Sequence, residues 1–381
     1  MLLKQSLKIV AAVCCWVLAG ASVAQLTKIE PGAIWPDDRG KHIQAHGGGI
    51  TKVGDTFYWF GEDRPQDLDR NVRAIACYAS EDLMNWRYRG RVFAMSNRPL
   101  PDDYPGKDKI HPRPPNLMRE GLVIERPKVY HNKSTGKFVM YFHLDSGDYW
   151  AAEVGVAVSD TVDGDYKLVS HFRPFGKESR DIGMFLDDDG SAYLIFEDRK
   201  VGFHIASLTD DYLNVKEIVH TWNARIEGGA LVKYDGMYYV IGSYLTGWDP
   251  NDNQYATAPS IKGPWTPFKD VAPKGARTYG SQSSFALKIE GSETTTVILM
   301  ADIWRPWAQH DSRYLWMPLE IGGGKAFLPQ PRPWSIDVKT GRVTIDQNAP
   351  AMVLPPPPPR EERRRPATRP ATQPSTQPAA N

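Results

Sequence analysis

The chain has 381 residues, a formal net charge of +1 and 41% hydrophobic residues. This near-neutral balance excludes a strongly basic nucleic-acid-binding protein and a polyanionic tail protein. The 12 Trp and 17 Tyr residues are a heavy aromatic load, which suits either a β-protein core or sugar-stacking surfaces.

The first residues have the pattern of an export signal. Lys4 and Lys8 precede an apolar stretch at 9–21, which small residues follow. We therefore expect a signal peptide over 1–24 and an exported protein, periplasmic or extracellular. The alternative is an uncleaved anchor, although the apolar stretch is short for a membrane span. After cleavage only Cys77 remains, so no intramolecular disulfide can form.

The body of the chain repeats one unit five times. Each unit has an apolar strand, a polar turn with glycine, and a second strand rich in aromatic residues. The turn glycines are Gly54, Gly136, Gly190, Gly236 and Gly291. Second strands are expected at 57–62, 138–143, 192–198, 237–243 and 294–302, and third strands at 76–86, 155–166, 203–213 and 254–265. Repeats of about 40–50 residues with several strands each predict an all-β fold, a five-bladed β-propeller.

We expect one domain over 30–348. Its last part, 332–345, has the pattern of a hairpin that packs on the propeller and closes it. The segment 351–381 is rich in proline, threonine and arginine and is predicted to be a disordered tail. The sequence has no nicotinamide fingerprint, phosphate-binding glycine loop or zinc-ligand spacing, so we expect no cofactor and no metal ion. We also expect a monomer with no nucleic-acid partner and no membrane span.

Polar residues recur at one register of the first strands. Counting back nine residues from the turn glycine reaches Asp181, Glu227 and Gln282, and the longer turn of the second repeat puts Glu125 at eleven. A propeller points the start of every first strand at one central pocket. A polar group inside an apolar strand costs free energy unless it is paired or functional. We therefore expect these four residues to share one site.

Two observations leave alternatives open. Basic residues lie near the three acidic ones in the sequence, so each acid could simply form an ion pair. These neighbours are Arg126, Arg180 and Arg225. In the first repeat the same count reaches Ala45, beside His46, so this repeat lacks a carboxylate at the shared register.

Glu227 is the candidate general acid. Glycines at 228–229 leave room for a ligand beside its carboxyl group. Burial, or the charge of Asp181 and Glu125 on neighbouring blades, would raise its pKa and keep its proton near neutral pH. Proton donation to a glycosidic oxygen is worth about 10²–10⁴ in rate. Gln282 carries a carboxamide, a poor base that would bind a sugar hydroxyl or position a water.

Other residues at loop positions could reach the same pocket as substrate contacts. They are His46, Glu62, Asp148, Tyr149, Thr246, Trp248 and Asn251. Trp248 stands between glycine and aspartate and is a candidate platform for stacking on a sugar. The alternative for Trp248 is packing within its loop.

Several stretches resemble glycoside hydrolase family 43, and within it the exo-β-1,3-galactanase branch. They are AHGGGI (45–50), FYWFGED (57–63), IERPKVYHN (124–132), 143–160, 179–199, 225–251 and TYGSQSSFAL (278–287). The resemblance implies a five-bladed propeller that hydrolyses glycosides with inversion, with an acid and a base on opposite faces of the sugar. It also implies that Glu62, Tyr149, Thr246 and Trp248 are pocket positions.

The resemblance assigns roles to the four central residues. Glu227 matches the general acid, Asp181 matches the residue that tunes the pKa of the acid, and Glu125 matches a glutamate that contacts substrate. Most of the family has an aspartate base on the first blade, where this chain has Ala45-His46-Gly47. The galactanase branch shares this gap, and there a glutamine matching Gln282 is proposed to handle the water as its imidic tautomer.

The leading hypothesis is a secreted exo-enzyme that releases galactose from β-1,3-galactan, such as the backbone of arabinogalactan. A second hypothesis is an arabinofuranosidase, xylosidase or galactofuranosidase of the same fold. A third is a carbohydrate-binding propeller without catalysis, which the missing first-blade carboxylate favours.

Overall fold

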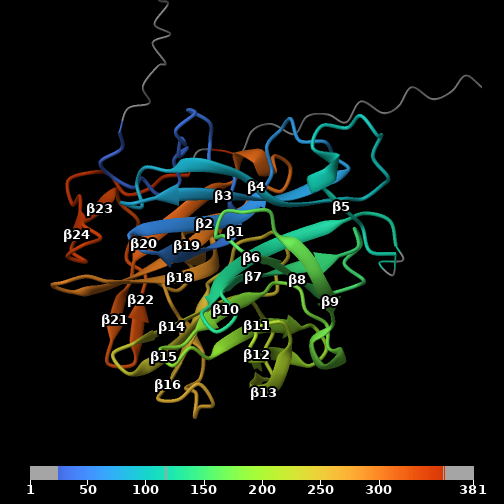
Figure 1. Ribbon diagram of the computed structural model, residues 1–381. Coiled ribbons are helices and arrows are strands. Elements are labelled where there is room, and N and C mark those ends of the chain that lie inside the picture. The colour runs from blue at the N-terminus through green and yellow to red at the C-terminus, as the bar shows by residue number, and fades with distance from the viewer. Residues whose placement is uncertain (1–24, 116, 118, 355, 357–381) are drawn as a thin grey trace, which may run out of the picture.

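The chain forms five β-sheets around a common axis (Figure 1). The computed structural model describes residues 25–115, 117, 119–354 and 356. Blade 1 comprises β1 (His46–Val53), β2 (Thr56–Asp63), β3 (Val72–Ser80), β4 (Arg87–Ser96) and β5 (His111–Pro112). Blade 2 comprises β6 (Val123–Asn132), β7 (Lys137–Asp145), β8 (Glu153–Ser159) and β9 (Lys167–Phe172). Blade 3 comprises β10 (Gly183–Leu186), β11 (Ala192–Asp198), β12 (Gly202–Leu208) and β13 (Val215–Trp222).

Blades 4 and 5 complete the ring. Blade 4 comprises β14 (Ile226–Tyr234), β15 (Met237–Tyr244), β16 (Gln254–Ala258) and β17 (Lys269–Asp270). Blade 5 comprises β18 (Gln282–Glu290), β19 (Thr295–Ile303) and β20 (Arg313–Pro318). The first strands β1, β6, β10, β14 and β18 contact one another in this order, and β18 returns to β1. The predicted five-bladed β-propeller is therefore confirmed.

The strand predictions fared best for the inner part of each blade. The five second strands lie within two residues of the predicted ranges, and the four predicted third strands are present. The outer strands β4, β9 and β13, and β20 of blade 5, were not predicted. The outer strands alternate between exposed and half-buried residues over much of their length, so they lack the continuous apolar pattern that identified the inner ones.

The core fills the spaces between neighbouring blades. The largest aromatic cluster lies where blade 5 meets blade 1. Trp59 of β2 and Trp316 of β20 have ring centroids 4.6 Å apart, and Trp35 stands edge-on to Trp316 at 5.1 Å. Such pairs contribute about 0.5–1.5 kcal/mol each beyond the area they bury. Tyr314 adds a hydrogen bond from its hydroxyl to the carbonyl of Ile43, 2.8 Å long. The segment that precedes β1 is therefore part of the closure.

The predicted C-terminal hairpin is present as β23 (Trp334–Ile336) and β24 (Val343–Ile345). It packs on the propeller through Trp334, whose indole donates to the carbonyl of Trp316 at 2.7 Å and whose backbone pairs with Ile29. The expectation that the hairpin closes the ring is only partly right. The direct contact of β1 with β18 closes it, and the hairpin contacts blade 5 through Trp334 and through the Gly341 carbonyl, which accepts a hydrogen bond from Thr296.

Four of the five first strands carry a β-bulge close to their first residue, at the end that faces the axis. The register breaks after His46 in β1, Glu125 in β6, Glu227 in β14 and Ser283 in β18. In three of them the next residue has a positive φ: Gly47 at 59°, Arg126 at 56° and Gly228 at 64°. A bulge redirects the side chains beside it, and bulges are common next to active sites.

The predicted signal peptide, tail and absence of a membrane span can be compared with the described residues only in part. The predicted signal peptide lies outside the described residues, as does most of the predicted tail. Met352 and Leu354, which that tail includes, pack against the main core cluster beside Gly32. Within the part of the chain that the structure describes, we find no helix with the length and apolar character needed to cross a bilayer.

Candidate active site

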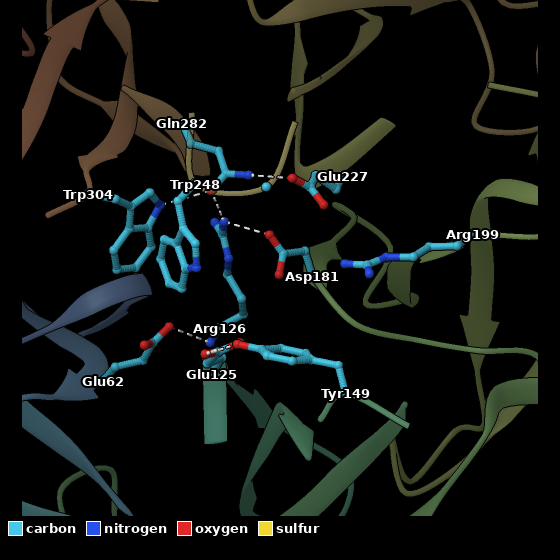
Figure 2. A pocket seen from close by; sticks show the side chains of 11 residues that line it. Glu62, Glu125, Arg126, Tyr149, Asp181, Arg199, Glu227, Trp248, Gln282 and Trp304 are labelled. Atoms are coloured by element: carbon cyan, nitrogen blue, oxygen red, sulfur yellow. Dashed lines mark hydrogen bonds and ion pairs between the residues drawn. The ribbon is translucent and has the colours of Figure 1, made fainter. Parts of the chain in front are cut away.

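A pocket of about 240 Å³ opens at the end of the axis where the first strands begin (Figure 2). All five blades contribute to its wall. Its lining consists of Glu62, Glu125, Arg126, Tyr149, Asp181, Arg199, Glu227, Gly247, Trp248, Gln282 and Trp304. The four predicted catalytic residues thus come together, although they are spread over more than 150 positions of the chain. Glu62, Tyr149 and Trp248 were also predicted to face this pocket.

Four predicted substrate contacts lie outside this lining. His46 is fully buried and stacks on Tyr314, with ring centroids 4.9 Å apart. Asp148 is exposed and forms an ion pair with Arg119.

The other two, Thr246 and Asn251, shape the loop that carries Trp248. The Asn251 amide donates to the Thr246 hydroxyl at 2.7 Å and to the carbonyl of Tyr244 at 2.8 Å. Their contribution to the pocket is therefore indirect, through the position of Trp248.

Four lining residues were missed from the sequence: Arg126, Arg199, Gly247 and Trp304. A signal for two of them exists, because second strands run antiparallel to first strands and end where first strands begin. Arg199 directly follows β11 and Trp304 directly follows β19. The end of β2 likewise supplies Glu62. Candidate pocket residues are therefore found both at the start of the first strand and at the end of the second strand of each blade.

The pairing register between the first and second strands shows which residues of the five blades are equivalent. Each blade presents one cross-strand pair at the pocket end. The pairs are His46 with Glu62, Glu125 with His143, Glu227 with Ser243 and Gln282 with Asp302. In blade 3 the pairing of Gly183 with Ile195, continued by two residues, places Asp181 opposite Glu197.

The carboxamide of Gln282 has a fixed orientation. Its oxygen accepts hydrogen bonds from the indole of Trp304, at 2.9 Å, and from the guanidinium of Arg126. Both partners can only donate, so the oxygen must face them. The nitrogen must then face Glu227 and Ser243, to which it donates at 3.1 and 2.9 Å. Gln282 thus stands at rest as an ordinary amide with all four hydrogen-bonding positions occupied.

Arg126 connects three blades. From β6 it donates to the carboxylate of Asp181 at 2.7 Å, to the carbonyl of Ser283 at 2.9 Å and to Gln282. Its own backbone amide donates to Glu62 at 3.1 Å. A positive φ is uncommon for a residue other than glycine, and such strain persists where the surroundings fix it. The bulge therefore holds the guanidinium in the floor of the pocket.

Glu227 has the electrostatic setting of a proton donor. Burial first, then the charge of Asp181 and, when it is ionised, the charge of Glu197 raise its pKa well above the ordinary glutamate value. One oxygen accepts from Gln282, and the other makes no hydrogen bond to any described residue. A proton on that second oxygen can therefore reach a ligand in the pocket. Gly228 permits this arrangement, because a Cβ there would lie 2.9 Å from the carbonyl of Ser283.

Glu125 has the opposite setting. Burial opposes its ionisation, but the ion pair with His143 and the charge of Arg64 outweigh it and lower its pKa to about 2. Tyr149 donates its hydroxyl to the same carboxylate at 3.0 Å. Glu125 is thus a permanent anion, suited to accept hydrogen bonds from sugar hydroxyls. The pKa of Glu62 rises to about 7 because of burial, in spite of its partner Arg64.

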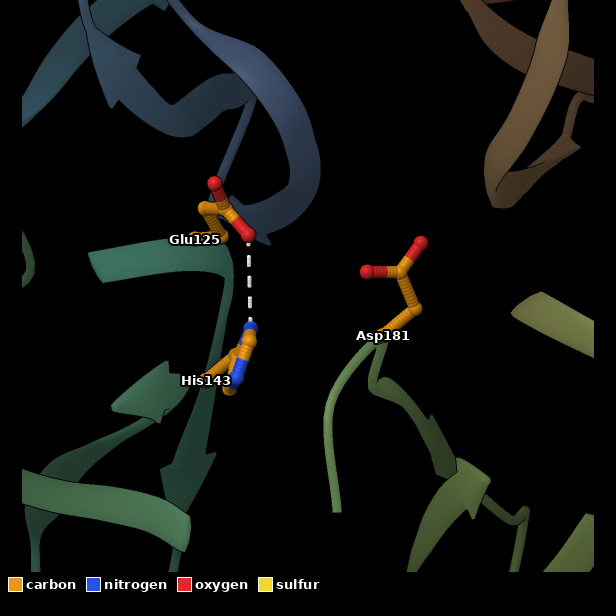
Figure 3. A group of neighbouring side chains, drawn as sticks. All are labelled: Glu125, His143 and Asp181. Atoms are coloured by element: carbon orange, nitrogen blue, oxygen red, sulfur yellow. Dashed lines mark ion pairs between the residues drawn. The ribbon is translucent and has the colours of Figure 1, made fainter. Parts of the chain in front are cut away.

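Glu125, His143 and Asp181 are the one group of described residues whose ligand atoms lie close enough together for a metal ion, all within 4.8 Å (Figure 3). His143 stands between two carboxylates, 3.3 Å from Glu125 and 2.9 Å from Asp145. Burial would lower its pKa, but the hydrogen bonds with Asp145 and Glu125 raise it to about 9. The charges of the group are balanced by ion pairs: Glu125 with Arg64, Asp181 with Arg126, and His143 with Asp145.

The alternative pairing of each acid with its sequence neighbour does not describe these contacts. Arg126 pairs with Asp181 and not with the adjacent Glu125. Arg180 pairs with Glu178 at 2.7 Å and not with the adjacent Asp181. The acids are therefore held by a network across blades.

A profile described as "Glycosyl hydrolases family 43" matches residues 45–284. The chain therefore belongs to glycosyl hydrolases family 43, and it is a glycoside hydrolase, as predicted. Two curated members share part of its sequence. Extracellular endo-α-(1→5)-L-arabinanase 2 of Bacillus subtilis (strain 168) is 23% identical over 291 residues, which are 67% of this chain and 58% of that protein. β-D-galactofuranosidase xynD of Aspergillus niger is 26% identical over 224 residues, 55% of this chain and 59% of that protein. The chain thus spans less than two thirds of these relatives.

Solved structures are more similar. The exo-β-1,3-galactanase from Phanerochaete chrysosporium, solved with galactose, is 38% identical, with a TM-score of 0.74 over 84% of this chain and 71% of that one. An exo-β-1,3-galactanase from Clostridium thermocellum is 34% identical, with a TM-score of 0.73 over 84% of this chain and 68% of that one. These similarities place the chain in the exo-β-1,3-galactanase branch of the family.

The ion pairs of His143 predict a pH-dependent stability. Its pKa is about 9 in the folded chain and about 6.5 when unfolded, so its contribution is complete below pH 6.5 and is lost as pH rises through 9. The upper limit of this contribution is about 3 kcal/mol. Urea unfolding at a series of pH values should show wild-type stability falling over this window relative to His143→Gln. His131→Gln, in the same blade but outside the pocket lining, should keep the wild-type slope. An unchanged slope in His143→Gln would contradict the assignment.

The contacts of Arg126 predict that shape as well as charge matters. In Arg126→Lys the positive charge remains, but one ammonium cannot hold Asp181, Gln282 and the Ser283 carbonyl together. We expect kcat/KM for glycoside hydrolysis to fall about 100-fold, because the reacting groups lose their mutual positions. The alkaline limb of the pH profile should stay near its wild-type position, since the charge near Glu227 is kept. Arg89→Lys on the outer strand β4 is the matched control. Activity within threefold of wild type in Arg126→Lys would refute this role.

Proposed function

We propose that this protein is an exported, inverting exo-glycosidase that releases galactose from the non-reducing end of β-1,3-galactan, the backbone of arabinogalactans. The proposal rests on one observation: an acid of raised pKa, a carboxylate of lowered pKa and a fixed carboxamide meet in one small pocket at the propeller axis. A pocket enclosed by five blades suits a chain end better than the middle of a polysaccharide. The similarity to exo-β-1,3-galactanases at 34–38% identity supports the choice of sugar.

A solved structure of the Phanerochaete chrysosporium enzyme adds support for an oligosaccharide substrate. A variant of that enzyme was solved with β-1,3-galactotriose; it is 38% identical to this chain, with a TM-score of 0.73 over 84% of this chain and 70% of that one. In this chain, Trp248 and Trp304 form a right-angled aromatic corner in the pocket, with ring centroids 5.5 Å apart. Such a corner can hold the apolar face of a galactose ring.

In the proposed reaction Glu227 donates its proton to the glycosidic oxygen as the bond to the anomeric carbon breaks. A water attacks that carbon from the opposite face, so the configuration inverts. Asp181 keeps the proton on Glu227 by its negative charge, and Arg126 holds Asp181 in place through their ion pair. Glu125 binds a hydroxyl of the terminal sugar. The family resemblance assigns the water to Gln282 as its imidic tautomer, formed when a proton moves from the amide nitrogen to the oxygen after one of its four contacts opens. The nitrogen lone pair of this tautomer accepts the proton of the attacking water, and the proton on its oxygen then leaves to solvent, which restores the amide.

The first test is the product. Incubation with β-1,3-galactan followed by proton NMR should show α-galactose first, with β-galactose appearing later by mutarotation. Initial release of β-galactose would mean retention and would overturn the mechanism. Release of arabinose, xylose or galactofuranose from aryl glycosides, with no galactose from galactan, would favour the second hypothesis.

The second test is the acid. Glu227→Gln should lower kcat about 10²–10⁴-fold because the proton donor is lost, while its shape is kept. Calorimetry should still detect β-1,3-galactotriose binding. Glu290→Gln, an exposed change at the far end of β18, serves as the control. Near-wild-type turnover by Glu227→Gln would mean that another residue is the acid.

A further inference from the structure

A second cavity, of about 210 Å³, lies beside the active-site pocket between blades 3 and 4. The two cavities share Arg199 in their walls. They are separated by the loop after β15, of which Leu245 lines the second cavity while Gly247 and Trp248 line the first. We call this second cavity the blade 3–4 cleft. It is nearly as large as the pocket for the terminal sugar, so it can take a ligand of similar size.

The position of the cleft relative to the acid indicates what it binds. Ile226 lines the cleft, and the next residue is Glu227. A general acid lies on the side of the leaving group, because its proton goes to the leaving oxygen. Arg199, which lines both the pocket and the cleft, lies on the side of the pocket that carries Asp181 and Glu227 (Figure 2), the side that the departing part of the substrate passes. This step rests on the proposed function.

The rim of the cleft is cationic. Arg225 is exposed, and its side chain forms no hydrogen bond or ion pair with any residue in the described ranges. The side chain of Arg199 is 48% exposed and lies 3.7 Å from Glu197, beyond hydrogen-bonding distance. Lys200 is 75% exposed, with Glu178 at 3.2 Å as its partner. Exposed pairs of this kind contribute little, so both cations remain available to a ligand.

Glu197 is the unexplained group of this cleft. It is 1% exposed, yet neither of its carboxyl oxygens has a hydrogen-bond partner. At the equivalent position of other blades, Ser243 receives a hydrogen bond from Gln282, and Glu62 accepts one from the amide of Arg126. Buried polar groups without partners are rare in folded proteins and call for an explanation. A ligand in the cleft that Glu197 lines would supply the missing partner.

The charge balance favours an anionic ligand. Burial, and then the charge of Asp181, raise the pKa of Glu197 to about 8, so it is neutral at pH 7 and can donate a hydrogen bond. Asp198, the other acid of the lining, is buried and accepts the backbone amide of Lys200 at 2.9 Å. The groups left to meet a ligand are thus two guanidiniums, one ammonium and a carboxylic acid. The planar fork of an arginine fits a carboxylate in a bidentate manner.

We propose that the blade 3–4 cleft binds an acidic sugar, a uronic acid attached as a branch to the leaving part of the galactan chain. Arg225 and Arg199 hold its carboxylate, and Glu197 and Asn223 bind its hydroxyls. The cleft would thus direct the enzyme to galactan chains that carry acidic branches.

The test compares three oligosaccharides: neutral β-1,3-galactotriose, the branched tetrasaccharide with β-glucuronic acid on O6 of its middle galactose, and galactotriose with a sulfate ester at that oxygen. Wild-type kcat/KM should be about 10-fold higher for the glucuronic acid compound than for the neutral one. High salt should reduce this ratio. In Arg225→Gln the ratio should fall below about twofold, while Arg89→Gln on β4 should keep it.

The outcomes separate this proposal from the proposed function. No hydrolysis of the neutral trisaccharide would refute the proposed function; calorimetry with the glucuronic acid compound on wild type and Arg225→Gln would then test the cleft alone. Equal kcat/KM values for the glucuronic acid compound and the neutral compound in wild type would overturn the proposal that the cleft binds a uronic acid. A ratio of these two values that stays unchanged in Arg225→Gln would also overturn it. A stronger preference for the sulfate ester would overturn the assignment to a uronic acid.

Discussion

The active site depends on one buried cation. Arg126 is 3% exposed and joins blade 2, where it originates, to Asp181 of blade 3 and to Gln282 and Ser283 of blade 5. A buried charge is costly unless it is paired and hydrogen-bonded, and removing one partner of such a pair costs about 3–5 kcal/mol. The guanidinium therefore fixes the relative position of three blades at the place where their side chains must cooperate. The ring itself is closed elsewhere, by aromatic packing between blades 5 and 1, so the fold and the site rest on different interactions.

The surplus of acids around that cation explains why a proton stays in the pocket. Four carboxyl groups and two guanidinium groups line it. All four carboxyls cannot ionise together at low cost, because like charges at close range oppose ionisation. Glu125 ionises most readily since His143 and Arg64 stabilise its charge, and Arg126 stabilises Asp181. Glu227 is the carboxyl group that stays protonated, because its only hydrogen-bond partner among the described residues is the amide of Gln282. The environment thus separates similar carboxyl groups: Glu125 stays an anion, Glu62 has a pKa of about 7, and Glu227 keeps its proton.

Much of this could be predicted from the sequence, because a propeller turns a one-dimensional spacing into a shared location. The interval from turn glycine to first-strand residue found Glu125, Asp181, Glu227 and Gln282 without knowledge of any contact. Arg126 was missed for a physical reason. Neighbouring residues of a regular strand point to opposite faces, so a residue beside Glu125 should face away from the pocket. The bulge after Glu125 breaks that alternation. The amino-acid sequence of the strand contains no signal that predicts a bulge with a positive φ at an arginine. The ion pairs across blades were missed because sequence proximity suggested nearer partners.

The cross-strand pairs at the pocket end of the five blades also suggest how a repeated fold can place one active site at its axis. Every blade presents a polar cross-strand pair to the axis, yet the pairs differ in character. Glu62 of blade 1 and both residues of the blade 5 pair, Gln282 and Asp302, make hydrogen bonds with neighbouring blades. In blade 3 Glu197 is buried without a partner beside an open cleft, next to the blade that carries the acid. Divergence at equivalent positions separates residues that hold the ring from residues that meet a ligand. The imidazole of His46 also lacks hydrogen-bond partners within the described ranges, but it is stacked on Tyr314 inside the core, so an unpaired polar group indicates a ligand site only where it borders a cavity, as Glu197 does.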